Sequence, residues 1–579
     1  MVSPQGVAKP PRVARGTLYL ANRWQVPAVG GLFLVSASDT HEVFNQAPPF
    51  AGLNLFTSDP GLGALVEGLP QALVDQLSQY GAEWGTPETF ELARLANAQP
   101  PSLRSFDPTG NRIDAVEFHP AFHALMRRSV AAGLQCSVWD AAGEEADART
   151  VARSARLYMT SAVEAGHLGA MMSTNAAVAA LAHTSDLADA WLPRIRTRRY
   201  DSSPRPLSAK ANALVGFGFA EKQGGSDLNA STTAATQSGS AWVLTGHKWF
   251  LSAPASDGFI VLAQIANQGL TCFLVPRYLP DGSLNNIRLM RLKDKLGHRS
   301  LPTAEAEFDH AHGWLIGEQG RGLEAIGDLL ALLRLDFSVA AAGGMRSALA
   351  EAVHFSRYRR AAGHELIDQP LMSRVLADMA LDAVAAAALV FRLAESYDRA
   401  ADSPAEAAFL RLMTPAVKYW VTKVAPAVIG EAMECVGGNG YVEDWRLARL
   451  YRDAPANSMW EGGGNVMALE LMSVLRKSSE PLEVVLANIE DALGSAAKST
   501  LNVLRAAAAV ALADEGSARI LTEQLAMTVA AAALRRRFPS VVADAFLETR
   551  LGKPWRSTYG MLDSRFDARA FVNYLCPAD

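Results

Sequence analysis

The sequence predicts a mainly helical α+β protein, in which a helical N-terminal domain, a central β-domain, a helical bundle and an extra helical C-terminal domain follow one another. At 579 residues the chain is too long for a single core. Short runs rich in β-branched and aromatic residues are confined to its middle, and long Ala- and Leu-rich segments fill the parts on either side. The expected bounds are 51–206, 207–318, 319–478 and 479–579, after an extended arm over 1–50.

The N-terminal part of the chain divides into this arm and the first helical domain. The arm is rich in proline, glycine and small residues and has no sustained period. Pro204 and Pro206 mark the end of the helical domain, because proline neither continues a helix nor donates to a sheet. Between the arm and these two prolines, helical periods cover residues 70–80, 120–134 and 148–165.

Short strand-like runs follow, separated by Gly, Asp, Asn and Pro. From residue 323 to about 475 the pattern is helical again, with breaks near Gly363, Pro404 and Gly437, and it predicts three or four long antiparallel helices in a bundle. A further Ala-rich helical block begins at residue 481. The strand-like runs cover residues 242–245, 259–265, 271–275 and 303–308.

Composition and charge narrow the class of protein. Hydrophobic residues make up 49% and charged residues 20% of the chain, which is typical of a soluble globular protein, and no run of about 18 apolar residues suggests a membrane span. The net charge of −5 excludes a global basic field that would draw the whole molecule to nucleic acid. The four cysteines lie far apart, without metal-ligand spacing, so we expect reduced thiols, no metal site and a cytoplasmic protein.

One short stretch, residues 457–465, suggests chemistry. Glu461 lies between the aromatic Trp460 and three successive glycines, residues 462–464. Glycines allow positive φ and a close approach of the backbone to a ligand, and we expect Asn465 to cap the helix that the next apolar run predicts. Glu461 could act there as a base. Taken alone, the stretch fits a glycine-rich turn with a solvated glutamate better.

Two further stretches have the composition of ligand-binding segments. In residues 216–227, four glycines and a Ser–Asp end form a loop whose amides could hold phosphate or ring oxygens, although neither the Rossmann nor the Walker spacing is present. In the strand predicted around residue 249, alternation puts Trp249 and Leu251 on one face and Phe250 and Ser252 on the other. A surface loop and core aromatics would explain these stretches equally well in isolation.

Taken together and in order, these stretches resemble the motifs of the acyl-CoA dehydrogenase superfamily of flavoproteins, over roughly residues 118–475. The resemblance implies the fold of that family, with a helical N-terminal domain, a central β-barrel domain and a C-terminal helical bundle. Residues 218–227 resemble the family's TEPxxGSD loop, and residues 247–252 resemble its KxWITN strand. Residues 359–363 resemble its RxxFG motif, residues 437–441 its GGxGY motif, and residues 460–462 its catalytic [YW]EG motif.

Within the superfamily the chain is most similar to the AidB branch, which has an added helical C-terminal domain and is tied to the bacterial response to DNA alkylation. The similarity rests on residues 221–227, 246–250 and 460–465, on the long N-terminal region around 54–59, and on the extra hundred C-terminal residues. A DNA-associated flavoprotein with weak or vestigial dehydrogenase activity is therefore the alternative to a working dehydrogenase.

The resemblance implies an FAD site at the junction of the domains. Trp249 would lie against the isoalloxazine ring, and Ser252 would lie near its N5 atom. Arg359 matches the arginine that reaches the FAD of a neighbouring subunit, which implies a homodimer or homotetramer. The expected cofactor-binding residues are Phe217, Gly218, Phe219, Ala220, Gly225, Ser226, Trp249, Phe250, Leu251, Ser252, Arg359, Met459, Trp460, Gly462, Gly463 and Asn465.

The implied reaction is the oxidation of an acyl-CoA thioester. Glu461 would remove the α-proton while a hydride passes from the β-carbon to the flavin. Burial beside Trp460 should raise the pKa of Glu461, whereas turn amides and the nearby helix N-terminus should lower it, and the sequence does not decide between them. A glutamate rather than an aspartate argues mildly against the nitroalkane-oxidase relatives.

Several residues depart from the family pattern. Ala220 stands where a threonine is usual, which removes one hydroxyl from the flavin site, and Gly463 replaces a Thr or Ser, which loosens the catalytic turn. Ala362, Gln369 and Glu434 change the motifs of the subunit contacts. These departures bear on the efficiency of acyl-CoA turnover more than on FAD binding.

The last hundred residues contain one cluster that could bind double-stranded DNA. Residues 480–579 carry eleven Lys and Arg against twelve Asp and Glu, a net charge of −1, whereas a DNA-binding domain usually has a basic excess. Only Arg535, Arg536 and Arg537 are clustered, and they form the candidate patch. A solvated helix end is the simpler interpretation.

Overall fold

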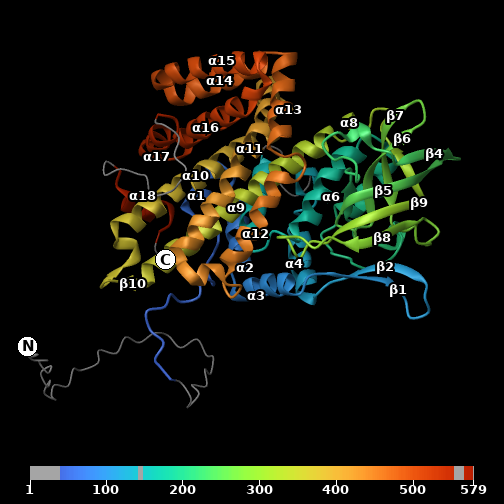
Figure 1. The fold of residues 1–579 in the computed structure, drawn as a ribbon, viewed down its shortest axis with the longest axis horizontal. Helices are drawn as coiled ribbons and strands as arrows, with labels where there is room; N and C mark the ends of the chain where they lie inside the picture. Colours follow the sequence, from blue (N-terminus) through green and yellow to red (C-terminus); the bar gives the residue numbers. More distant parts are fainter. Residues whose placement is uncertain (1–39, 141–147, 553–565, 578–579) are drawn as a thin grey trace, which may run out of the picture. The chain divides into compact units, whose positions relative to one another are not determined.

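The computed structural model describes residues 40–140, 148–552 and 566–577, and the chain separates into two units, 1–44 and 45–579. Of the first unit only residues 40–44 are described, and they form no helix or strand. The rest of the expected arm, up to residue 39, lies outside the described residues. The second unit holds all the helices and strands of the described residues (Figure 1).

Helices form most of the N-terminal part of the second unit, as expected. Pro87 occupies the first position of α3, and the hydroxyl of Thr86 accepts a hydrogen bond from the amide of Thr89. The N1 proline and the N-cap hydrogen bond therefore both define where this helix begins. The helices are α1 Pro60–Leu65, α2 Gln71–Trp84, α3 Pro87–Ala98, α4 Pro120–Ala131, α5 Arg149–Ser161, α6 Leu168–Leu181 and α7 Ser185–Ile195.

An antiparallel hairpin, β1 Ser102–Phe106 and β2 Arg112–Glu117, interrupts these helices and is absent from the expected elements. Its turn is held by Asp107, whose carboxylate accepts hydrogen bonds from the amides of Thr109 and Asn111. The hairpin joins the β-domain, because the amide of Leu289 donates to the carboxylate of the hairpin residue Asp114 at 3.0 Å.

Seven strands form the central β-domain. The pairings β5–β9, β9–β7, β7–β6, β6–β4 and β4–β5 make a closed circuit, so the sheet closes on itself as a barrel. The predicted barrel is thereby confirmed. Strands β3, β4 and β8 were not predicted from the sequence, because β3 has four residues of which two are glycine, β4 is largely exposed, and β8 carries two arginines among its six residues. The strands are β3 Val215–Gly218, β4 Ala234–Ser238, β5 Ala241–Ser252, β6 Gly258–Ile265, β7 Gly269–Pro276, β8 Ile287–Leu292 and β9 Thr303–Ile316.

Three long helices form the bundle: α9 Gly327–Tyr358, α10 Pro370–Arg399 and α11 Pro404–Val436. They end near the predicted breaks. The two-residue strands β10 Arg360–Ala361 and β11 His364–Glu365 make a tight turn after α9. Ser403 caps α11 by accepting from the amide of Glu406, and Gly437, at φ +72°, ends it.

Three shorter helices complete this region: α8 Gly322–Ala325, α12 Arg446–Met459 and α13 Gly464–Lys477. The expected cap of α13 is wrong. The helix begins one residue before Asn465, and Gly463 occupies the N-cap position without a side-chain hydrogen bond. The three successive glycines allow the chain to turn into the helix sooner than the apolar pattern suggests.

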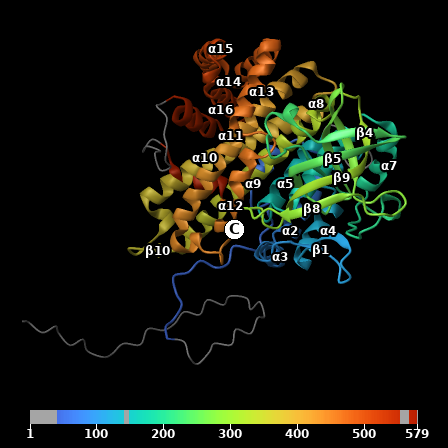
Figure 2. The same ribbon diagram turned by 45° about the vertical axis from the view of Figure 1, so that its right-hand side comes forward.

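The C-terminal helices share one apolar core with the bundle. Leu521, Leu525 and Val529 of α16 are fully buried in the same cluster as the bundle residues. In both views these helices and the barrel lie on opposite sides of the α9–α11 bundle (Figures 1 and 2). The helices are α14 Glu480–Leu493, α15 Lys498–Ala513, α16 Ala518–Arg537, α17 Ser540–Phe546 and α18 Ala568–Leu575.

The predicted fold class is confirmed by this order of helices, barrel, bundle and added helices. In the described part of the chain, no helix combines the length and the apolar character that a membrane crossing requires. All four cysteines are free and buried.

Candidate active site

A cavity of about 590 Å³ lies where the N-terminal helices, the barrel and the bundle meet. Its size falls within the usual range for the ligand sites of enzymes. The walls come from α6, α9, β3 and the loop after it, β5, the start of β9 and the loop before it, and the end of α12, the start of α13 and the connection between them. The lining residues are Gly169, Met172, Phe217, Phe219, Ala220, Gly225, Ser226, Leu228, Phe250, Ser252, Leu301, Thr303, Leu330, Leu333, Arg334, Phe337, Met459, Trp460, Glu461, Gly462, Gly463 and Val466.

Most of the predicted site residues are brought together in these walls, although they come from three separate parts of the chain. The exceptions are Gly218, Trp249, Leu251, Arg359 and Asn465. The predicted residues that line the cavity are Phe217, Phe219, Ala220, Gly225, Ser226, Phe250, Ser252, Met459, Trp460, Glu461, Gly462 and Gly463.

Strand β5 turns Trp249 away from the cavity, contrary to expectation. The ammonium group of Lys293 lies 3.2 Å from the centroid of its indole ring, and that of Lys222 lies 5.5 Å away. The next residue, Phe250, lines the cavity together with Ser252, because successive side chains of a strand point to opposite faces. The aromatic wall on this strand is therefore formed by Phe250, one residue later than expected.

The other exceptions have structural explanations. Leu251 is fully buried inside the barrel. Gly218 lies against it, since a Cβ at residue 218 would be 2.9 Å from Cδ1 of Leu251. Arg359 follows the end of α9 and donates a hydrogen bond to the carbonyl oxygen of Asn45 at 2.6 Å. Asn465 lies in the first turn of α13, beyond the cavity wall.

The turn that carries Glu461 has an unusual backbone. Glu461 has a φ of +52°, in the left-handed region that residues with a side chain seldom occupy. Gly462 follows at φ +111°, a conformation that favours glycine because a residue with a Cβ is strained there. Backbone strain of this kind persists where surrounding contacts hold it, and it is common at ligand sites.

The environment of Glu461 answers the question that the sequence left open. Burial raises the pKa of Glu461 to about 7, and the positive charges of Lys418 and Arg334 oppose this rise without cancelling it. A carboxylate that titrates near neutral pH is suited to accept a proton from a substrate and release it again. A strongly shifted carboxylate in a cavity wall also marks a candidate catalytic group.

Trp460 is held in place by the loop between β8 and β9. Its ring centroid lies 4.9 Å from that of His298 and 5.7 Å from that of Phe337. The ammonium group of Lys295, on the same loop as His298, lies 5.6 Å from the Trp460 ring and donates to the carbonyl oxygen of Leu301 at 2.6 Å. These contacts join the barrel to the turn that carries Glu461.

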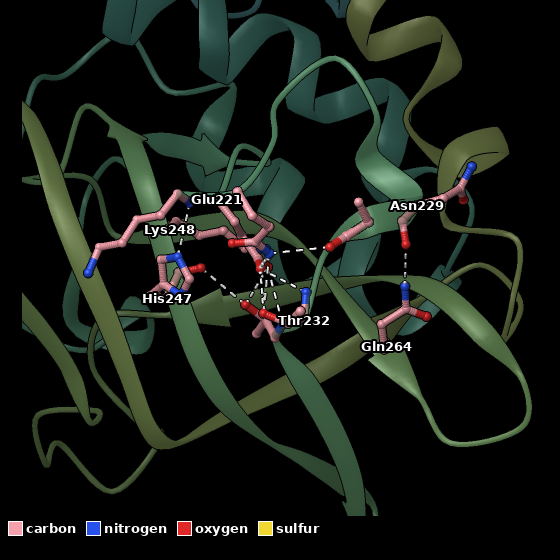
Figure 3. Close-up of polar contacts among 10 residues, drawn as sticks. Glu221, Asn229, Thr232, His247, Lys248 and Gln264 are labelled. Atoms are coloured by element: carbon pink, nitrogen blue, oxygen red, sulfur yellow. Dashed lines mark hydrogen bonds and ion pairs between the residues drawn. The ribbon is translucent and has the colours of Figure 1, made fainter.

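The loop after β3 is anchored by a buried ion pair between Glu221 and Lys248, with 2.6 Å between Oε1 and Nζ and neither side chain exposed. Figure 3 shows the carboxylate at the centre of a hydrogen-bond network. It also accepts from the amide of Thr232 at 2.7 Å and from the hydroxyl of Thr233 at 2.6 Å. Burial alone would raise the pKa of Glu221, but the hydrogen bonds from Lys248 and Thr233 and the charge of Lys248 hold it below its usual range.

Sequence patterns missed Lys418 and Arg334, the two cations beside the Glu461 turn. Both are buried and lie on the long helices α11 and α9, far from the turn in sequence. Each is a single basic residue within an apolar helical run, 413–421 and 329–335 respectively. A basic residue is seldom buried without a partner. A lone Lys or Arg in an apolar helical run is therefore a signal that could have identified both residues as candidates for a buried polar contact.

The arginines of the candidate DNA patch are all paired with carboxylates. The pairs bring together residues of different helices, so the positive charges are compensated on the folded surface. They are Arg535 with Asp544, Arg536 Nη2 with Asp491 Oδ2 at 2.9 Å, and Arg537 Nη2 with Glu395 Oε1 at 2.5 Å.

The sequence matches three family models: the adaptive response protein AidB N-terminal domain over residues 45–202, the acyl-CoA dehydrogenase middle domain over 216–311, and the acyl-CoA dehydrogenase C-terminal domain over 320–475. It is 44% identical over 450 residues to the "Putative acyl-CoA dehydrogenase AidB" of Escherichia coli (strain K12), covering 76% of this chain and 81% of that protein. It is 32% identical to acyl-CoA dehydrogenase family member 11 of Caenorhabditis elegans, covering 78% and 75%.

Solved structures show the same architecture. Caenorhabditis elegans ACDH-11, solved in complex with C11-CoA, superposes with a TM-score of 0.82 at 27% identity, covering 90% of this chain and 94% of that one. A glutaryl-CoA dehydrogenase from Mycobacterium smegmatis, solved with FADH2, shares the fold with a TM-score of 0.51 at 20% identity, covering 62% and 89%.

The fold and the sequence comparisons together define an oxidoreductase of the flavin-dependent dehydrogenase type. The chain belongs to the acyl-CoA dehydrogenase family, with an AidB-type N-terminal domain. The cofactor of this family is FAD.

Proposed function

We propose that this protein oxidises the acyl group of a CoA thioester between its α- and β-carbons, with Glu461 as the base that removes the α-proton. The observation that carries this proposal is the position of Glu461, a partly buried carboxylate with a pKa of about 7 in the wall of a cavity where three parts of the fold meet. An acyl-CoA is also the ligand named for the Caenorhabditis elegans structure described above.

The cavity has the room and the chemistry that a flavin requires. A Cβ at Gly463 would meet nothing within 4 Å, so this wall leaves open space beside the turn. Phe219 and Phe250 offer aromatic surface for a planar ring system. The hydroxyls of Ser226 and Ser252 line the cavity and have no hydrogen-bond partner among the described residues, so both are available to a ligand. We propose that these residues, with Phe217 and Ala220, hold the FAD.

The proposed reaction divides the work between the protein and the cofactor. The carboxylate of Glu461 takes the α-proton, and the electron pair of that C–H bond becomes the new bond between the α- and β-carbons. FAD supplies the acceptor for the hydride that leaves the β-carbon. The apolar side chains of Met172, Leu333 and Phe337, on α6 and α9, would hold the acyl chain and keep water from the reacting carbons.

An anaerobic titration of the FAD-loaded protein with short, branched and long acyl-CoAs tests this proposal. Loss of the flavin absorbance with one class of acyl-CoA would support a working dehydrogenase and identify its substrate class. Retention of the oxidised flavin spectrum with every acyl-CoA would contradict it. Unesterified CoA is the control, because it has no acyl group to oxidise.

The pH dependence of the reaction should follow the ionisation of Glu461. Its carboxylate must be ionised to accept a proton, so kcat/KM is expected to rise about tenfold per pH unit up to about pH 7 and to level off above it. Steady-state rates between about pH 5 and pH 9 measure this profile. A profile that stays flat down to about pH 5 would mean that the base has an ordinary carboxylate pKa or lies elsewhere.

The alternative of a DNA-associated protein receives no support from the charges of the candidate patch. Since Arg535, Arg536 and Arg537 are each paired with a carboxylate, few counterions would be released on contact with DNA. We expect a variant with all three changed to glutamine to bind duplex DNA as the unchanged protein does, measured by gel shift at low and physiological salt. A clear loss of salt-sensitive binding in the variant would restore this alternative.

A further inference from the structure

Three consecutive carbonyl oxygens of the catalytic turn accept hydrogen bonds from two buried cations. Nζ of Lys418, on α11, donates to the carbonyl oxygens of Trp460, at 2.5 Å, and Gly462. Nε of Arg334, on α9, donates to the carbonyl oxygen between them, that of Glu461, at 3.2 Å. We propose that Lys418, supported by Arg334, is a positioning residue that holds the turn in the conformation that presents the Glu461 carboxylate to the cavity.

These hydrogen bonds differ from the ordinary capping of a helix. Helix α12 ends at Met459, and the amide of Trp460 already closes its last turn on the carbonyl oxygen of Ala456. Residues 460–462 belong to the connection between α12 and α13, which has no regular backbone ladder of its own. The two cations come from other helices, so they fix the connection against the bundle.

The backbone of Glu461 requires such support. A left-handed φ is unfavourable for a residue with a Cβ, and it persists only where neighbouring groups hold it. Gly463 gives little help, because open space lies where its side chain would pack. The hydrogen bonds from Lys418 and Arg334 are therefore the polar contacts best placed to keep the turn from relaxing.

Both cations are themselves held firmly. Lys418 is 1% exposed and lies within a long, buried helix. Arg334 is bound through Nη1 to the carboxylate of Glu470, on α13, at 2.6 Å. Helices α9, α11 and α13 thus all contribute to the arrangement that holds the turn. Positioning of a catalytic group within a fraction of an ångström matters greatly for rate.

Lys418 also affects the charge of the site. The charged groups that face Glu461 are Lys418 from α11 and Arg334 from α9, with Glu470 of α13 next to Arg334. Burial and the charge of Arg334 lower the pKa of Lys418 to about 7, while the charge of Lys418 lowers the pKa of Glu461 against the effect of burial. Removal of the Lys418 charge should therefore raise the pKa of Glu461 further.

The inference rests on the proposed function for its kinetic consequence but can be measured without it. The variants are Lys418→Met, which keeps the apolar stem and removes the donors, and Lys418→Arg, which keeps a charged donor. Arg411→Met, on the same helix, is the matched control, since Arg411 is exposed and lies about two helical turns before Lys418. If Lys418→Met gives no folded protein, Lys418→Gln takes its place.

Backbone hydrogen exchange over residues 456–468 measures the turn directly, without substrate. We expect Lys418→Met to speed the exchange of these amides at least tenfold, Lys418→Arg to restore most of the protection, and Arg411→Met to leave it unchanged. Unchanged exchange in Lys418→Met would overturn the proposal, whatever its activity.

Two kinetic readouts separate positioning from a general loss of stability. Lys418 does not line the cavity, so Lys418→Met should lower kcat about 100-fold with little change in KM. It should also move the acid limb of the pH profile to higher pH, whereas Lys418→Arg should leave the limb in place. Faster exchange with unchanged kcat and pH profile would overturn the positioning role. If Glu461→Gln keeps its full rate, the proposed function fails, and the exchange data alone then decide the role of Lys418.

Discussion

Glu461→Gln is expected to slow flavin reduction by an acyl-CoA by about 10³-fold or more while FAD remains bound. The amide has nearly the same shape as the carboxylate but cannot accept the α-proton, and the loss of a general base typically costs about 10²–10⁴ in rate. The turn should keep its conformation, because the carbonyl oxygens of residues 460–462 still face Lys418 and Arg334. Rapid mixing of the oxidised protein with acyl-CoA under anaerobic conditions measures this rate.

Glu490→Gln provides the control for this experiment. Glu490 is an exposed carboxylate on α14 and lies outside the cavity wall, so the same chemical change there should leave the rate of flavin reduction as it was. Retention of the rate within about tenfold in Glu461→Gln would assign the α-proton to another base.

Glu221→Gln is expected to destabilise the barrel by about 3–5 kcal/mol, because it leaves the buried ammonium group of Lys248 without its ionic partner. The loop after β3 should loosen as well, since the same carboxylate accepts from Thr232 and Thr233. Part of the cavity wall belongs to this loop, so FAD should be released at a lower temperature. Thermal unfolding followed by near-UV circular dichroism and by flavin fluorescence measures both effects.

Glu318→Gln is the matched control for the ion pair. Glu318 pairs with Arg321 at 3.1 Å, but its side chain is 73% exposed, and such surface pairs contribute only about 0–1 kcal/mol. Similar unfolding temperatures for the two variants would show that the Glu221–Lys248 pair does not anchor the loop.

The order of the domains and the location of Glu461 were within reach of the sequence. The glycines around residues 218–225 and 462–464 indicate tight turns or a close approach of the backbone to a ligand, and this indication can be taken from the sequence alone. Long helices with clear breaks at Gly363 and Pro404 were equally predictable, because local propensity and tertiary packing agree there.

Side-chain directions were harder to predict. Trp249 and Phe250 are adjacent aromatic residues on one strand, and a shift of one residue exchanges the cavity face for the opposite face. The resemblance to the family's KxWITN strand implied Trp249 at the flavin, whereas the structure places Phe250 at the cavity. Nothing local distinguishes the two, since the choice depends on how β5 pairs with β9.

Contacts between distant residues were beyond sequence patterns altogether. Lys418 meets the turn from 42 residues away, and the partner of Arg537, Glu395, lies 142 residues away. Three adjacent arginines suggested a basic patch at residues 535–537, but the fold supplies a carboxylate to each of them from other helices. The net charge of the segment was the better guide.

The central claim, that Glu461 removes the α-proton, is tested most directly by solvent exchange at the α-carbon. An acyl-CoA with sulfur in place of the β-carbon can lose its α-proton but cannot give up a hydride, so it isolates this step. Incubated in D2O with the FAD-loaded protein, it should gain deuterium at the α-carbon, and Glu461→Gln should reduce the rate of gain to that of the free thioester. Equal deuterium gain with both proteins would contradict the account.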